Sequence, residues 1–91
     1  MPIEVQIPTP LRAQTEGQDT VTAAGATVQA VLADVIGQFP ALKDRLFDEA
    51  GQPRRFINLF VNDEDIRFLD GLETAVQEGD SLAIIPAVAG G

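Results

Sequence analysis

The sequence predicts a small α+β domain in which a mixed sheet of four to five strands packs against one main helix. Residues 3–7 alternate apolar and polar residues with the period of two that is typical of strands, and residues 56–61 alternate between two faces with the same period. Residues 28–39 instead show the spacing of an amphipathic helix. A length of 91 residues is enough for one domain, and 45% hydrophobic with 22% charged residues is an ordinary globular composition.

The first half of the chain is predicted to form a hairpin followed by the main helix. A strand over residues 3–7 precedes a polar turn over 13–18, and a second strand passes through Val21 and Ala23. The helical face consists of five apolar residues with i, i+3, i+4 spacing: Val28, Val31, Leu32, Val35 and Phe39. Thr27 is expected to cap this helix and Pro40 to end it, before a short helical turn with Leu42, Leu46 and Phe47.

The second half is predicted to complete the sheet. After a loop over residues 48–55, a strand over 56–61 turns Ile57, Leu59 and Val61 toward the helix and Phe60 outward. A tight turn at 62–65 leads to a short strand over 66–68, and a helical turn falls within 72–76. The apolar run 81–85 suits a strand in the middle of the sheet. This order is that of the ubiquitin-like β-grasp, which we assign to residues 1–86.

Charge and missing residue types exclude several classes of function. Acidic residues outnumber basic ones 14 to 6, and the net charge of −8 repels nucleic acid and anionic membranes, so neither is expected as a partner. The absence of Cys and His excludes disulfides, thiolate nucleophiles and Cys/His metal sites. The start of the chain lacks the pattern of a signal peptide and no apolar run is long enough to span a membrane, so we expect a cytoplasmic protein.

Motifs for bound ions and cofactors are also missing. The acidic run 63–65 invites a calcium interpretation, but Arg67 and Phe68 occupy the fifth and sixth positions of the loop, where an EF-hand needs Asp or Asn and then Gly. A solvated turn is the better interpretation. The internal glycines stand singly and form no phosphate-binding pattern, and scattered carboxylates alone do not predict acid–base catalysis. We therefore expect the chain itself to bind neither a metal nor a cofactor.

The last five residues, 87–91, are predicted to form a flexible tail ending in Gly-Gly. Gly90 and Gly91 have no side chains, and the residues before them are small. Beyond Pro86 the tail reaches about 17 Å when extended, at ~3.3 Å per residue. Such an arm, ending in a carboxylate, could be threaded into the active site of another protein, although terminal glycines also occur without any function.

The stretch VNDEDIRFLDGLETAVQEGDSLAIIPAVAGG, residues 61–91, resembles the C-terminal third of the MoaD/ThiS sulfur-carrier proteins. The matching features are the asparagine-acidic turn after a strand, the acidic-glycine turn before the last strand and the ending VAGG. Chain length and element order agree as well. Within the family, the opening VQIPTPLR, the segment RRFINLFVNDEDIRF and the ending PAVAGG are most similar to a carrier of an actinobacterial cysteine-synthesis pathway.

This resemblance implies a chemistry for the tail. A ubiquitin-activating-type adenylyltransferase would use ATP and Mg²⁺ to form the acyl-adenylate of Gly91, and a sulfur donor would convert it to a thiocarboxylate. In the cysteine pathway, the sulfur would attack the aminoacrylate that a pyridoxal-phosphate cysteine synthase forms from O-phosphoserine. A metalloprotease would then release cysteine and the carrier. The chain would be a co-substrate of these partner enzymes, not an enzyme.

The resemblance also implies roles for particular residues. Gly91 would carry the adenylate and the thiocarboxylate with Gly90 beside it, and Ala87, Val88 and Ala89 would lie in the partner's groove. Phe60 and Phe68 match hydrophobic positions of the family's docking sheet.

Three alternatives stay open. The acceptor could instead be molybdopterin (with the chain as the small synthase subunit), thiazole or tRNA. The chain could be a ubiquitin-like modifier joined through Gly91 to lysines of other proteins, in which case homopolymers would be limited to Lys43, its single lysine, or the N-terminus. It could also be an interaction domain whose tail has no function.

Overall fold

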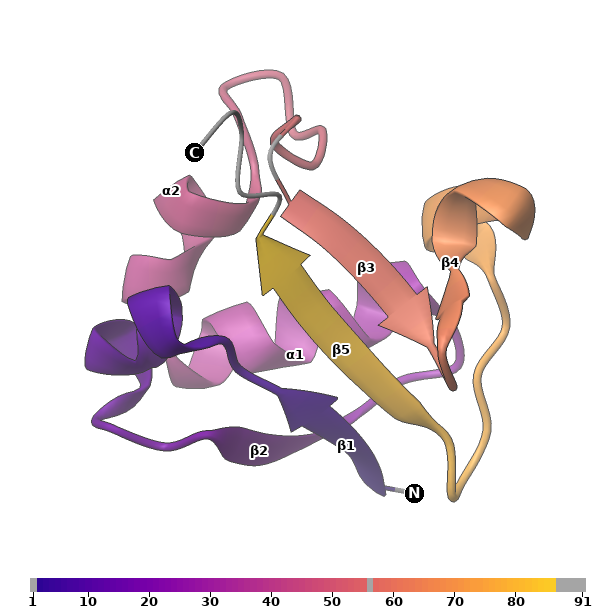
Figure 1. Cartoon of the computed structure of the whole chain (residues 1–91), viewed down its shortest axis with the longest axis horizontal. Helices are drawn as coiled ribbons and strands as arrows, with labels where there is room; N and C mark the ends of the chain where they lie inside the picture. The colour runs from indigo at the N-terminus through magenta and orange to yellow at the C-terminus, as the bar shows by residue number, and fades with distance from the viewer. Residues whose placement is uncertain (1, 56, 87–91) are drawn as a thin grey trace.

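In the computed structural model, which describes residues 2–55 and 57–86, one mixed sheet is covered on one face by the helices (Figure 1). The strands are β1 Pro2–Gln6, β2 Thr20–Ala24, β3 Ile57–Val61, β4 Glu64–Asp65 and β5 Ser81–Pro86. The α-helices are α1 Val28–Gln38 and α2 Lys43–Leu46. Short 3₁₀ helices are η1 Thr9–Thr15, η2 Pro40–Leu42, η3 Ile66–Phe68 and η4 Gly71–Glu73.

The strand order within these residues is β2-β1-β5-β3-β4. Strands β1 and β5 are parallel, and the other neighbours are antiparallel. The predicted β-grasp fold, with its mixed sheet and one main helix, is confirmed. The prediction that the last strand lies in the middle of the sheet is confirmed too.

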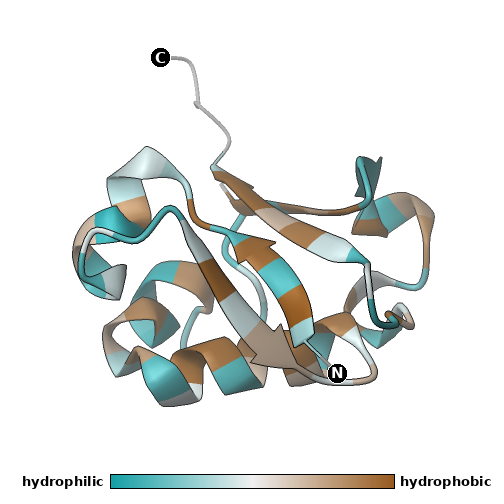
Figure 2. Cartoon of the chain, turned by 90° about the horizontal axis from the view of Figure 1, so that it is seen from below, coloured by the Kyte–Doolittle hydropathy of each residue, from teal (hydrophilic) through white to brown (hydrophobic). Residues whose placement is uncertain are grey.

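The core lies between α1 and the inner face of the sheet. Alternate residues of each strand point inward, which gives the banded hydropathy along the strands in Figure 2. The most deeply buried members, each at most 2% exposed, are Ile3, Val5, Ile7, Val28, Val31, Leu32, Val35, Leu42, Leu46, Leu82 and Ile84. Helix α1 begins as predicted, because the Ala30 backbone N–H donates to the Thr27 hydroxyl at 3.2 Å.

Two local predictions are wrong. Residues 13–15 of the turn expected at 13–18 instead belong to the 3₁₀ helix η1, because Leu11 and Thr15 are buried and the Thr15 hydroxyl hydrogen-bonds to the backbone carbonyl oxygens of Arg12 and Gln18. The short strand expected over 66–68 is instead β4 at Glu64–Asp65, and residues 66–68 form η3. The side chain of Asp65 causes this difference, because it accepts the Arg67 backbone N–H at 2.9 Å and so caps η3.

Candidate functional site

The candidate site is the C-terminal end of β5, from which residues 87–91 continue along the chain. β5 pairs with β1 on one side and with β3 on the other, and the last pair of its ladder with β3 joins Ile57 and Pro86. Leu82 and Ile84 anchor it to the core with exposed fractions of 0% and 2%. Pro86 therefore has a fixed place in the fold. The predicted site residues Ala87, Val88, Ala89, Gly90 and Gly91 lie outside the described residues, so their roles stay predictions.

The start of β5 is held by hydrogen bonds between two turns. The Asn62 side-chain Nδ2 donates to Asp80 Oδ1 at 2.9 Å, and the Asn62 side-chain Oδ1 accepts the Ser81 backbone N–H at 3.0 Å. Asp80 also accepts the Gln77 backbone N–H at 2.9 Å. These bonds, that from Asn62 first, lower the pKa of Asp80 below its ordinary value. The two turns that carry the sequence resemblance are thus joined directly and fix the entry into β5.

The turn itself needs residues that tolerate a left-handed backbone. Asn62 and Asp63 have φ values of 49° and 73°, the geometry of a two-residue hairpin between β3 and β4. Asn and Asp adopt this conformation more readily than other residues with side chains. The acidic run therefore has a structural explanation, and residues 2–55 and 57–86 hold no group of three His, Cys, Asp or Glu side chains that could bind a metal ion.

The outer face of the sheet carries a small apolar patch beside the site, which we call the outer-face patch: Phe60, Ala83 and Ile85. Phe60 lies directly opposite Ala83 in the ladder, and its side chain points away from α1 and is half-buried. Ile85, two residues further along β5, is 44% exposed. The predicted outward orientation of Phe60 is confirmed, whereas its role in docking stays a prediction.

Phe68 does not lie on the sheet, so that part of the prediction is wrong. It comes after β4 in η3 and is 86% exposed. The cause is again Asp65, whose carboxylate caps η3 and binds the Arg67 guanidinium through three contacts of 2.6–3.1 Å. Within the predicted solvated turn, Asn62 and Asp63 are exposed whereas Asp65 is buried. The hydrogen bonds from Arg67 lower the pKa of the Asp65 carboxyl.

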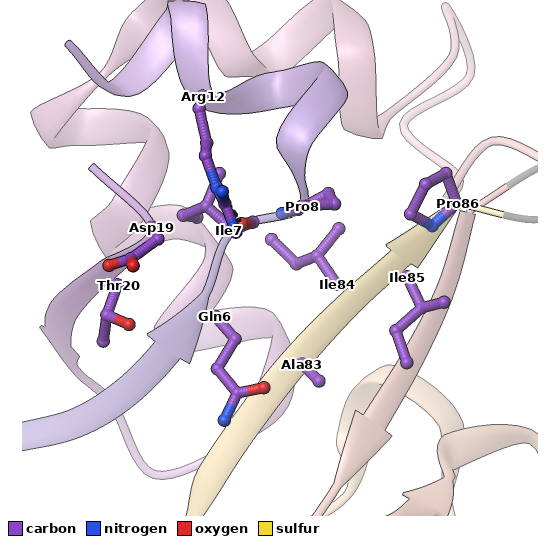
Figure 3. Close-up of a pocket in the computed structure, with 10 residues that line it drawn as sticks. All are labelled: Gln6, Ile7, Pro8, Arg12, Asp19, Thr20, Ala83, Ile84, Ile85 and Pro86. Atoms are coloured by element: carbon purple, nitrogen blue, oxygen red, sulfur yellow. Dashed lines mark hydrogen bonds between the residues drawn. The ribbon is translucent and has the colours of Figure 1, made fainter. Parts of the chain in front are cut away.

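A shallow hollow of about 350 Å³ adjoins the end of β5 (Figure 3). It opens because β1 pairs with β5 only as far as Gln6 and Ala83, after which Pro8 leads the chain away into η1. Arg12 and Asp19 are the charged residues among those that line it, and the Arg12 Nε donates to the Ile7 carbonyl at 3.0 Å. One guanidinium and one carboxylate give no pair of groups for acid–base catalysis.

The described part of the chain contains no helix with the length and apolar character needed to cross a membrane. Neither the hollow nor the outer-face patch brings together groups that could carry out a reaction.

Comparison with known sequences identifies the family of this chain. The model of the ThiS family matches residues 5–91. The sulfur carrier protein CysO of Mycobacterium tuberculosis is 48% identical over 93 residues, with full coverage of both chains. A putative sulfur carrier protein of Archaeoglobus fulgidus is 33% identical over 92 residues, also with full coverage.

Solved structures of related proteins are also similar to this chain. A chain of the BexX/CysO complex of Amycolatopsis orientalis is 50% identical, with a TM-score of 0.90 and coverage of 98% of this chain and 99% of that one. Small archaeal modifier protein 1 of Methanosarcina acetivorans is 30% identical, with a TM-score of 0.89 and coverage of 99% and 96%. These relatives are carriers and modifiers, which confirms the prediction that the chain is not an enzyme. The chain belongs to the ThiS family of ubiquitin-like β-grasp proteins.

Proposed function

We propose that this chain is a sulfur carrier whose C-terminal Gly91 is converted to a thiocarboxylate, with cysteine biosynthesis as the destination of the sulfur. The observation that carries the proposal is the 48% identity, over the full length of both chains, to a protein named sulfur carrier protein CysO. The fold supports it, because the last strand is the central one and it leads directly into a tail that ends in Gly-Gly.

The chemistry needs no side chain of the carrier. The α-carboxylate of Gly91 is ionised at neutral pH, since such groups have pKa values of about 3.3–3.7, and a carboxylate is a poor acylating agent. In an adenylyltransferase its oxygen attacks the α-phosphorus of ATP, with Mg²⁺ balancing charge, and pyrophosphate leaves. Hydrosulfide, supplied by a sulfur donor, then attacks the acyl carbon, and AMP leaves with one of the former carboxylate oxygens. The terminus now carries a nucleophilic sulfur in place of one oxygen.

Delivery of that sulfur requires further partners. A pyridoxal-phosphate cysteine synthase would present an electron-poor alkene made from O-phosphoserine, to which the thiocarboxylate sulfur adds. The acyl group then moves from sulfur to the neighbouring amine, and a metalloprotease hydrolyses the resulting amide. The products are cysteine and a carrier that again ends in the Gly91 carboxylate.

The first test is the intact mass of the protein isolated from its own organism. A component about 16 Da heavier, located at Gly91 by fragmentation, would support the carrier; because oxidation of Met1 adds nearly the same mass, the location is essential. Deletion of Gly91 should abolish sulfur transfer and leave the urea unfolding midpoint unchanged. Sulfur transfer by the deletion variant would overturn the proposal.

A second function, conjugation to other proteins, is favoured by one observation. Small archaeal modifier proteins 3 and 1 of Haloferax volcanii are 35% and 38% identical over 66 residues, which cover 72% of this chain. A modifier would be found linked through Gly91 to lysines of many proteins. Ladders on denaturing gels that disappear when Gly91 is deleted, together with an unmodified free terminus, would favour this alternative over the carrier.

A further inference from the structure

The positive charges of this acidic chain are gathered at one end of the fold. All five arginines line three surface hollows, two at the end of β5 and one along the neighbouring strand β3, and we call them the basic collar: Arg12, Arg45, Arg54, Arg55 and Arg67. Pro86 lines two of these hollows, and the third contains Ile57, its partner in the ladder. Lys43, the remaining cation, lines none of them.

The collar differs in sign from the rest of the molecule. The same three hollows contain three carboxylates, those of Asp19, Asp44 and Asp65, which leaves the collar region with a formal side-chain charge of +2. The rest of the chain has Lys43 and eleven carboxylates, a formal charge of −10, consistent with the total of −8. Of the three collar carboxylates, Asp65 is already neutralised by Arg67.

Three of the five guanidinium groups are held in place. The Arg12 Nε donates to the Ile7 carbonyl at 3.0 Å, and the Arg54 Nε donates to the Asp44 carbonyl at 2.6 Å. Arg67 is held by the buried Asp65 carboxylate, yet 70% of the Arg67 side chain remains exposed. A guanidinium that is already oriented loses less entropy when it binds a partner carboxylate. Arg45 and Arg55 are exposed and complete the collar.

We propose that the basic collar docks onto an acidic rim around the active-site entrance of the enzyme that activates Gly91. The inference rests on the proposed function, because it identifies the surface used by that same partner. The tail reaches only about 17 Å from Pro86, at ~3.3 Å per residue, so an enzyme that acts on Gly91 must contact the surface around Pro86. That surface is positive, and carboxylates on the partner complement it. Nucleic acid is the poorer occupant, since the remaining surface repels it.

A matched pair of variants on one helix tests this proposal. Arg45→Glu and Lys43→Glu both lie in α2, both change an exposed side chain and both alter the charge by the same amount, but only Arg45 belongs to the collar. Arg55→Glu, in the loop before β3, provides a second collar variant on another element. The assay is pyrophosphate release by the adenylyltransferase of the same organism, at carrier concentrations below KM. Far-UV circular dichroism and urea midpoints verify that each variant is folded.

Both collar variants are expected to lower kcat/KM about 5- to 10-fold at ~50 mM NaCl, and the loss should shrink to about 2-fold at ~500 mM because salt screens the attraction. Lys43→Glu should stay within about 2-fold of wild type at both concentrations. If the collar variants behave like Lys43→Glu while wild type is adenylated normally, the docking role of the collar is refuted and the proposed carrier function is unaffected. If wild type is not adenylated and its terminus carries no sulfur in cells, the proposed function fails and the collar proposal with it.

Discussion

Replacing Gly25 by Ala should destabilise the fold at the junction between β2 and α1. A Cβ at this position would lie 2.6 Å from the backbone nitrogen of Val31 and 2.8 Å from two atoms of Ala30. Distances below 3.0 Å essentially never occur for a Cβ, so the first turn of α1 would have to move. The turn resists this movement, because Val28 and Val31 are fully buried against the sheet.

The size of the effect can be worked out from these contacts. Overpacking of this kind typically costs about 1–3 kcal/mol of folding free energy. A domain of this size melts about 4–8 °C lower for each kcal/mol lost, so a melting temperature lower by about 4–24 °C is expected. The first turn of α1 consists of backbone that cannot rotate away as a flexible side chain would, which places the loss in the upper part of this range.

Gly37→Ala is the matched control. Gly37 lies in α1, a Cβ there would have no neighbour within 4 Å, and its φ is outside the left-handed region. Ala should therefore stabilise the helix by about 0.5–1 kcal/mol. Urea unfolding followed by far-UV circular dichroism measures both changes. A Gly25→Ala protein with the midpoint of wild type would show that the close approach of Gly25 to α1 is not a constraint, and the reasoning would be refuted.

Three further predictions concern the cap, the turn and the outer face. Thr27→Ala should cost about 1 kcal/mol in urea unfolding, and Thr27→Ser should restore most of it. Because the pKa of Asp80 is lowered in the folded state, its stabilising effect is present above the ordinary value of 3.8 and is lost as the pH falls through the folded pKa. Asp80→Asn should thus flatten the decrease in urea midpoint between about pH 6 and pH 2.5 relative to wild type, and an unchanged slope would contradict this. Phe60→Asp should keep the fold and slow adenylation by the partner enzyme, and an unaltered rate would remove Phe60 from the docking surface.

Local sequence patterns were sufficient to predict the secondary structure of each segment that packs mainly against the core. The alternation of residues 3–7 and 57–61 results directly from having one face against α1. The apolar face of the helix over residues 28–38 and its cap, Thr27, both lie within one continuous stretch of the sequence. These features therefore identify the β-grasp fold before any long-range contact is known.

The segment after the hairpin shows why local patterns fail elsewhere. Ile66 and Phe68 alternate with Arg67, which suits a strand as well as the observed 3₁₀ turn. Asp65 favours the 3₁₀ turn over the strand, because its carboxylate accepts the Arg67 backbone N–H that a longer strand would have used in the ladder. Hydropathy does not report such a competition, so the position of β4 and the exposure of Phe68 could not be predicted.

The hydrogen bond between Asn62 and Asp80 was not predicted from the sequence for a different reason. Each residue occupies a turn that looks complete by itself, and 18 positions separate them in the sequence. Only the pairing of β3 with β5 brings the two turns to the same end of the sheet. A pair of turn motifs that recur together in a resemblance is a signal that they touch, and here it would have found the contact.

The arrangement of β5 accounts for a functional protein without His or Cys. When the reacting group is the terminal carboxylate of the main chain, the fold does not have to provide a nucleophile or a base. Its task is to hold the last strand, from which the terminus continues, in a defined place. β5 has such a place because it is paired on both sides, buried through Leu82 and Ile84, and held at its start by Asn62. Only five residues separate Pro86 from the terminal carboxylate, so a partner that binds the surface around Pro86 has the carboxylate at a high effective concentration. A longer connection would lower that concentration without adding reach that a docked partner needs.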